Sequence, residues 1–154
     1  LPHCAAMSQL SFSYCRIDTE GAHALSEALP RCATLSRLNI SRERPMAARA
    51  HAGAVNHIGT EGVRALSEAL AHCAALSQLD ISRCDLGTEG ACALSEALSR
   101  CATLSQLKMS ENGFDARGAR ALSKALPRCA ALSQLDISKN RIGVEGARAL
   151  SEAL

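Results

Sequence analysis

Aromatic side chains are scarce in this sequence of 154 residues: it has no tryptophan, one tyrosine and two phenylalanines. A single large core usually depends on such rings, so we expect many small layers of leucine, isoleucine and alanine instead. No stretch approaches the roughly 18 consecutive apolar residues of a membrane-spanning helix. The formal net charge is only +2. The composition therefore predicts neither membrane insertion nor strong attraction to nucleic acid.

One heptad recurs along the chain. It reads LSQLDIS in two places, and the copies start at Met7, Leu35, Leu76, Leu104 and Leu132. The intervals are 28, 41, 28 and 28 residues, so the second unit is 13 residues longer than the others. A fixed period of this length is typical of solenoid proteins, in which each unit buries its apolar face against its neighbours. We interpret residues 1–154 as a single array of about five repeats.

Each repeat contains a strand pattern followed by a helix pattern. In the heptad, Leu79 and Ile81 alternate with Asp80 and Ser82, which predicts a half-buried strand with the polar pair pointing outward. The block TEGACALSEAL that follows has the apolar spacing of a helix. We expect N-caps from the threonines that precede glutamate, and a close approach of helix and strand at the first-turn glycines. These residues are Thr19, Thr60 and Thr88, and Gly21, Gly62, Gly90, Gly118 and Gly146.

The repeat resembles the leucine-rich repeat of the ribonuclease-inhibitor-like subclass. The resemblance is clearest in LSQLDISKNRIGVEGARALSEAL, residues 132–154, and it covers nearly the whole chain. It implies an α/β fold: a right-handed solenoid, curved as a horseshoe arc, with a parallel sheet on the concave face and helices on the convex face. Similar repeats occur in NOD-like receptors and in Ran GTPase-activating proteins.

Two columns of residues point to the interior. The ninth position of the repeat holds Cys15, Asn56, Cys84, Asn112 and Asn140. The resemblance implies an internal ladder there, in which amide donors bond backbone carbonyls; we favour this structural role over a metal site. A second thiol column holds Cys4, Cys32, Cys73, Cys101 and Cys129. No C-x-x-C pair occurs, so we expect no metal or cofactor. We favour reduced thiols in a cytoplasmic, reducing location, and disulfides between neighbouring repeats are the alternative.

The concave face is the candidate binding site. Its outward columns are the third, fifth, seventh and eighth positions of the repeat, and the seventh is always serine. The alternative interpretation of these columns is an ordinary solvated sheet face. The residues we select as candidate partner contacts are Tyr14, Arg37, Asn39, Arg42, Asp80, Arg83, Lys108, Glu111, Asp136 and Lys139.

No nucleophile–base pair, phosphate-binding glycine loop or metal cluster is recognisable in the sequence. The sequence therefore predicts a non-enzymatic module that binds a protein partner, with no nucleic acid and no membrane involved. Two alternatives stay open. One is a GTPase-activating protein of the Ran-activator type, and the other is the ligand-sensing arm of a NOD-like receptor.

Three further features carry expectations. The extra residues of the second repeat are best placed at 43–55, as a partner-binding loop, a neutral bulge or a gene-model artefact. On the convex side, Arg120 and Lys124 place two like charges together, which indicates either a basic spot or neutral surface variation. The chain starts within a repeat and stops at ALSEAL without a polar cap, so we expect a fragment of a longer array.

Overall fold

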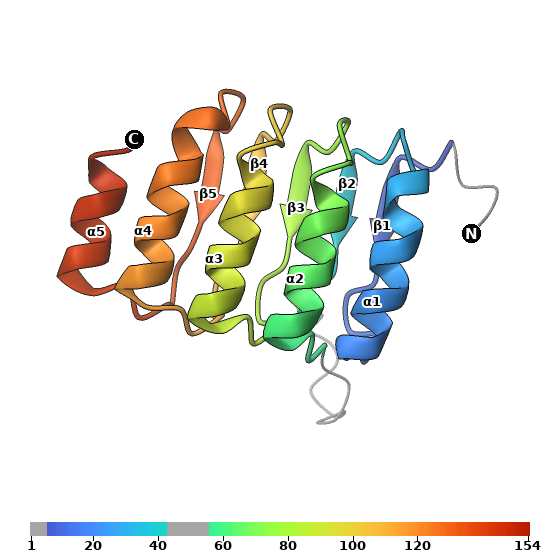
Figure 1. Ribbon diagram of the computed structural model, residues 1–154, viewed down its shortest axis with the longest axis horizontal. Helices are drawn as coiled ribbons and strands as arrows, with labels where there is room; N and C mark the ends of the chain where they lie inside the picture. The colour runs from blue at the N-terminus through green and yellow to red at the C-terminus, as the bar shows by residue number, and fades with distance from the viewer. Residues whose placement is uncertain (1–5, 43–55) are drawn as a thin grey trace, which may run out of the picture.

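The computed structural model describes residues 6–42 and 56–154, which form five strand–helix units in a row (Figure 1). The strands are β1 (Gln9–Ser11), β2 (Arg37–Asn39), β3 (Gln78–Asp80), β4 (Gln106–Lys108) and β5 (Gln134–Asp136). The helices are α1 (Thr19–Ala28), α2 (Gly59–Leu70), α3 (Gly87–Leu98), α4 (Ala116–Ala125) and α5 (Gly143–Ser151), with 3-10 turns η1 (Leu29–Arg31) and η2 (Leu126–Arg128). The predicted α/β repeat fold is confirmed. The predicted insertion at 43–55 lies outside the described residues.

All five strands form one parallel sheet in chain order, and the helices cover one of its faces (Figure 1). The fourth residue of every heptad stands in one row across the sheet: Leu10, Leu38, Leu79, Leu107 and Leu135. The long interval between β2 and β3 leaves this register unchanged. Each helix packs against the helix before and after it in the chain. The sheet therefore repeats one layer rather than closing around a centre.

The core lies between the sheet and the helices and consists almost entirely of small aliphatic side chains. Leu79, Ile81 and Leu94 of the third unit are 1%, 0% and 0% exposed. The same columns are only partly buried in the fifth unit, at Leu135 and Ile137, because no further unit covers them in the described structure. Burial in this fold thus depends on having a neighbour on both sides.

The helices begin differently from what the sequence pattern predicted. The N-cap role predicted for threonine is wrong: in α1 the cap is Asp18, whose Oδ1 accepts from the Gly21 N–H at 2.9 Å. The Thr19 hydroxyl instead donates to the carbonyl of Ile58 in the next repeat at 3.0 Å. At the position equivalent to Asp18, α2 has Gly59 with φ of +65°. A side-chain cap and a left-handed glycine are two local solutions to the same helix start.

The first-turn glycines bring neighbouring helices together, not helix and strand as the sequence predicted. A Cβ on Gly62 would lie 2.9 Å from the Ala22 Cβ of α1 and 2.8 Å from the Ile58 Cγ2. On Gly146 it would lie 2.9 Å from the Ala119 Cβ of α4. Absence of a side chain at this column therefore sets the distance between successive helices.

Candidate functional site

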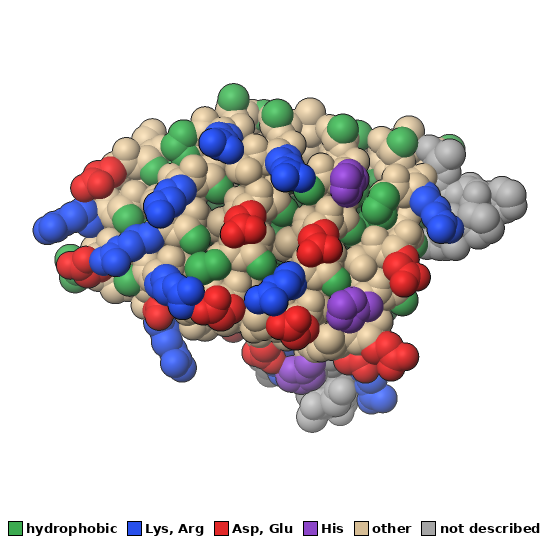
Figure 2. All heavy atoms as spheres, in the orientation of Figure 1, with side chains coloured by type: hydrophobic (Ala, Val, Ile, Leu, Met, Phe, Trp, Pro, Cys, Tyr) green, Lys and Arg blue, Asp and Glu red, His purple; other side chains and the backbone are tan. Residues whose placement is uncertain are grey.

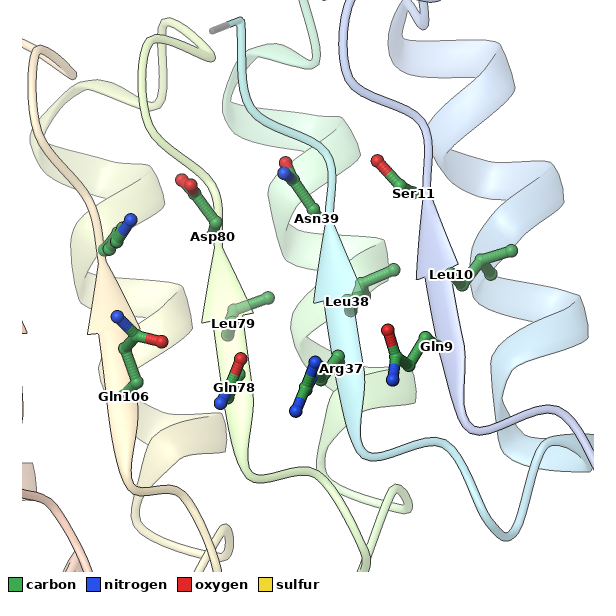
Figure 3. A pocket seen from close by; sticks show the side chains of 11 residues that line it. Gln9, Leu10, Ser11, Arg37, Leu38, Asn39, Gln78, Leu79, Asp80 and Gln106 are labelled. Atoms are coloured by element: carbon green, nitrogen blue, oxygen red, sulfur yellow. The ribbon is translucent and has the colours of Figure 1, made fainter.

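The candidate site is the sheet face that the helices leave open, which we call the open face. It carries the third and fifth residues of each heptad. Across β1 to β4 this face is hollowed to a volume of about 350 Å³ (Figure 3). Its polar lining residues are Gln9, Ser11, Arg37, Asn39, Gln78, Asp80, Gln106 and Lys108. Amides, one guanidinium, one ammonium and one carboxylate thus line a shallow groove across four strands.

Three of the fifth-column side chains also accept hydrogen bonds from the backbone of their own repeat. The Oδ1 atoms of Asn39, Asp80 and Asp136 accept hydrogen bonds from the N–H of the serine two residues later, at 2.9, 3.1 and 3.0 Å. This turn lowers the pKa of the Asp136 carboxyl, chiefly through the backbone N–H of Ser138. Three of the predicted contacts therefore shape the strand end, and one carboxylate oxygen of each aspartate is not used by this turn.

The same turn determines where the side chains of the seventh-column serines lie. They were predicted to point outward, and that prediction is wrong for Ser41 and Ser82, which are 0% and 3% exposed. The chain leaves the strand direction at this point, so the strict alternation of a strand no longer sets where these side chains go. Ser41 and Ser82 are thus part of the strand end and are not available to a partner on the open face.

The eighth-column residues stand at one rim of the open face in left-handed backbone. The φ values of Tyr14, Arg83, Glu111 and Lys139 are +65°, +58°, +54° and +55°. Arg42, in the same column, is the last described residue before position 43. Left-handed φ is uncommon for residues with a side chain, so the rim has an unusual and repeated backbone shape.

Three of these rim residues form one charged cluster, Arg83, Glu111 and Lys139. The Glu111 Oε1 accepts from the Arg83 Nη2 at 2.7 Å and from the Lys139 Nζ at 2.6 Å. The hydrogen bond from Arg83, followed by that from Lys139, lowers the pKa of the Glu111 carboxyl to about 2. Residues of three different repeats are thereby joined, and a partner that binds them must meet a preassembled group with a net positive charge.

Arg37 differs from the rim residues. It is exposed in the hollow, and among residues 6–42 and 56–154 it forms no ion pair within 4.0 Å. Figure 3 shows its guanidinium beside the amides of Gln9 and Gln78. In β4 and β5 the same column has a contact of its own, from Gln106 Nε2 to Gln134 Oε1 at 2.7 Å. Lys108, the other cation of the groove, has no ion pair within the described residues either, but it is only half-exposed. Arg37 is therefore the cation of the groove most available to an anionic group.

Behind the rim, the ninth column is bonded to the interior backbone. Asn112 is 3% exposed; its Nδ2 donates to the carbonyls of Ile81 and Met109 at 2.9 and 3.0 Å, and its Oδ1 accepts from the Cys84 N–H at 2.8 Å. Asn140 makes equivalent bonds one repeat further on. Each asparagine thus ties its own repeat to the preceding one.

Asn56 occupies this column in the long second repeat. Its Nδ2 donates to the carbonyls of Phe12 and Ile40 at 2.9 and 2.8 Å, and its Oδ1 accepts from the Ile17 N–H at 2.8 Å. The two donor bonds of Asn56 match those of Asn112, whereas its acceptor bond comes from Ile17, two residues beyond the ninth-column residue Cys15.

The two ninth-column cysteines behave differently from each other. The Cys84 thiol is 0% exposed and donates to the carbonyl of Ile40 at 3.2 Å, and burial raises its pKa to about 12. Cys15 is exposed, and its Sγ lies 3.5 Å from the carbonyl of Ser13 in its own turn. Only Cys84 reaches across to another repeat in the way the asparagines do.

Comparison with known proteins decides the family. The model described as "Leucine Rich repeat" matches residues 3–26, 72–95, 100–123 and 128–151, together more than half of the chain. The chain belongs to the leucine-rich-repeat family. The unmatched interval contains the long second repeat, where the period is broken. No curated protein matches the sequence.

Two solved leucine-rich-repeat-like structures share the fold. The tropomodulin C-terminal domain of Caenorhabditis elegans has a TM-score of 0.72 and 16% identity over 97% of this chain and 83% of that one. Leiomodin-1 actin-binding site 2 has a TM-score of 0.69 and 15% identity over 96% of this chain and 81% of that one. At such identities the likeness concerns the fold alone.

The second thiol column of this leucine-rich-repeat chain lies at the helix ends. The thiols of Cys73, Cys101 and Cys129, which follow α2, α3 and α4 in the chain, donate to carbonyls at the end of the helix one repeat earlier. The acceptors are Leu29, Leu70 and Leu98, at 3.8, 3.7 and 3.3 Å. All seven cysteines of the described part are free thiols.

The described part brings no three His, Cys, Asp or Glu side chains together as metal ligands. It also contains no helix with the length and hydrophobicity to span a membrane.

Proposed function

We propose that this leucine-rich-repeat protein binds a protein partner along its open face and performs no catalysis there. The observation that carries the proposal is the hollow across β1 to β4, because it is lined by side chains that still have hydrogen-bonding capacity. A repeat array offers such a surface as a continuous, rigid strip. Both structural neighbours named above are likewise domains of this fold.

Within that face, the candidate contacts fall into two groups. Arg37 and Lys108 lie in the hollow itself, together with the outer carboxylate oxygen of Asp80. Asn39 also lines the hollow, and Asp136 continues the column of Lys108 in the next strand. The second group is the rim, with the cluster of Arg83, Glu111 and Lys139 and with Tyr14 and Arg42 in the same column. We expect the first group to provide most of the affinity, because the charges of the rim cluster already have partners.

Actin is the first partner to test, because the neighbouring leiomodin-1 domain carries the name of an actin-binding site. The two alternatives considered from the sequence, a Ran-type GTPase activator and a receptor sensor arm, gain no support from the described residues. A reducing, cytoplasmic location stays a prediction, and the seven free thiols are compatible with it.

The test uses photo-crosslinking from defined positions in the cells that make the protein. A photoreactive residue at Gln78 or Gln106 reports on the open face, and one at Glu27, exposed on α1, serves as the control. We expect one protein to be crosslinked from Gln78 and Gln106 and not from Glu27. The same crosslinked proteins from all three positions would overturn the proposal.

The identified protein, and purified actin, are then titrated with Arg37→Glu and with the control Arg31→Glu, an exposed arginine of η1. Loss of a groove cation should weaken binding by about tenfold, as for a charge at an interface core. The control should bind like the unsubstituted protein. Equal effects of the two substitutions would count against the open face.

A further inference from the structure

The outer face of α4 carries a cationic stripe, formed by Arg117, Arg120, Lys124 and Arg128. All four side chains are exposed, and their spacing of three, four and four residues places them on one side of the helix and its 3-10 extension. The other four helices have an acidic residue in the first turn, whereas α4 has none. Figure 2 shows these basic side chains gathered over α4.

This arrangement costs stability locally. Arg117 stands in the first turn, where the helix dipole disfavours a cation. Arg120 and Lys124 are like charges at i,i+4, which also oppose each other. The Asp115 cap and an ion pair from Arg117 to Glu89 at 2.5 Å offset part of this. Packing does not require this row of cations, since the equivalent positions of every other repeat combine acidic residues with basic or uncharged ones. Such a conflict between local electrostatics and helix stability indicates a function.

A groove of about 530 Å³ runs beside the stripe, between α3 and α4. Its floor is made of small side chains, including Ser95, Ser99, Ala121 and Ala125. Small residues there allow another backbone to approach closely. Cys92 also lines it, and Glu96 is an acid among the lining residues.

The charges in this groove are not evenly neutralised. Arg117 pairs with Glu89, and Arg120 pairs with Glu145 of α5 at 2.5 Å. Lys124 and Arg128 form no ion pair within 4.0 Å with any residue in the described ranges. The free positive charge therefore collects at the end of the groove where α4 passes into η2.

We propose that this groove binds an acidic amphipathic helix of a partner protein. Carboxylates one turn apart on such a helix match the spacing of Lys124 and Arg128. Small side chains of the partner between those carboxylates fit against the small residues that line the groove. Nucleic acid fits less well, because its phosphates would extend over Glu89, Glu96 and Glu145 and the chain has a net charge of only +2. This surface lies on the opposite side of the sheet from the proposed open-face site, so the two proposals stand independently.

The probe is a helical, alanine-rich peptide of about 20 residues, long enough to form a helix in water, with glutamates repeated at i and i+4. It is titrated into the isotope-labelled protein and followed by NMR. We expect shifts to concentrate at the amides of α3 and α4 that line the groove, and binding to weaken as salt rises. A peptide of the same composition with its glutamates spread around the helix should bind more weakly.

The decisive variant is Lys124→Glu with Arg128→Glu. Glutamate at position 124 restores the residue that the equivalent column has at Glu27, Glu68, Glu96 and Glu152, so the fold is expected to persist. Binding should fall by about tenfold as attraction becomes repulsion between like charges. The neutral pair Lys124→Gln and Arg128→Gln should weaken it less, and Arg31→Glu, in the matching LPR turn of the first repeat, should leave it unchanged.

Four outcomes would overturn the inference. These are unchanged binding by the charge-reversed variant, equal binding of the spread-glutamate peptide, shifts scattered over the whole surface or absent, and a DNA duplex that binds more tightly than the peptide at the same salt concentration.

Discussion

Replacement of Asn112 by alanine tests the ladder that joins the repeats. The substitution removes donor bonds to the carbonyls of Ile81 and Met109 and one acceptor for the Cys84 N–H, all at 2.8–3.0 Å. The Met109 carbonyl keeps a bond from the Asn140 Nδ2 at 3.0 Å, so the Ile81 carbonyl and the Cys84 N–H are the groups that lose their partner. Each buried group left without a partner costs about 1–3 kcal/mol, with carbonyls at the lower end. We therefore expect Asn112→Ala to lower the free energy of unfolding by about 2–4 kcal/mol. That is a large part of the 5–15 kcal/mol typical of a domain.

The assay is urea unfolding followed by circular dichroism. Two further variants calibrate it. Asn112→Cys reproduces the solution found at Cys84, whose thiol bonds the carbonyl of Ile40, and should cost about half as much because one donor remains. Asn140→Ala should cost about 1–2 kcal/mol, because Asn140 is only partly buried and water can replace its bonds. The reasoning fails if Asn112→Ala costs less than about 1 kcal/mol, or no more than Asn140→Ala.

Three other perturbations have defined outcomes. Gly62→Ala should destabilise by about 1–2 kcal/mol in urea unfolding, because its Cβ meets α1, whereas Gly21→Ala, with no such helix contact, should cost less; equal costs would contradict the helix-spacing role. The folded-state pKa of Glu111, about 2, lies below the ordinary 4.5. Its stabilisation is thus complete above pH 4.5 and lost as the pH falls toward 2, so Glu111→Gln should flatten that part of the stability–pH curve. Iodoacetamide at pH 7 should modify exposed Cys15 and leave buried Cys84, with its pKa of about 12, unmodified until unfolding, as mass spectrometry would show.

Repetition is the reason why so much of the fold could be predicted. Leu79 and Leu135 stand in identical heptads, so each copy of the pattern supports the assignment of the others. The period gave the strand positions, and the register of Leu38 with Leu79 follows from it in spite of the long interval. Solenoid packing between neighbours then required a single parallel sheet, as the structure shows.

The side-chain partners at the candidate site could not be predicted in the same way. A column identifies which residues are neighbours, but the partner of Glu111 depends on rotamers and on a left-handed backbone that the strand pattern does not contain. Thr19 shows the same limit, because its hydroxyl donates to a carbonyl 39 residues away in the chain and does not cap its own helix. The turn made by Asp80 did have a sequence signal, an Asp or Asn two residues before serine.

Contacts between elements in this chain join units that follow each other directly, helix to helix and strand to strand. Ordering can therefore start at any interface and spread one unit at a time, and no distant chain segments must first find each other. The reverse process should begin at the flanking units, where Leu135 and Ile137 are only partly buried. Amide hydrogen exchange should then be slowest around β3 and β4 and faster toward either side. The protection of an amide from exchange would thus report how far its repeat lies from the middle of the row.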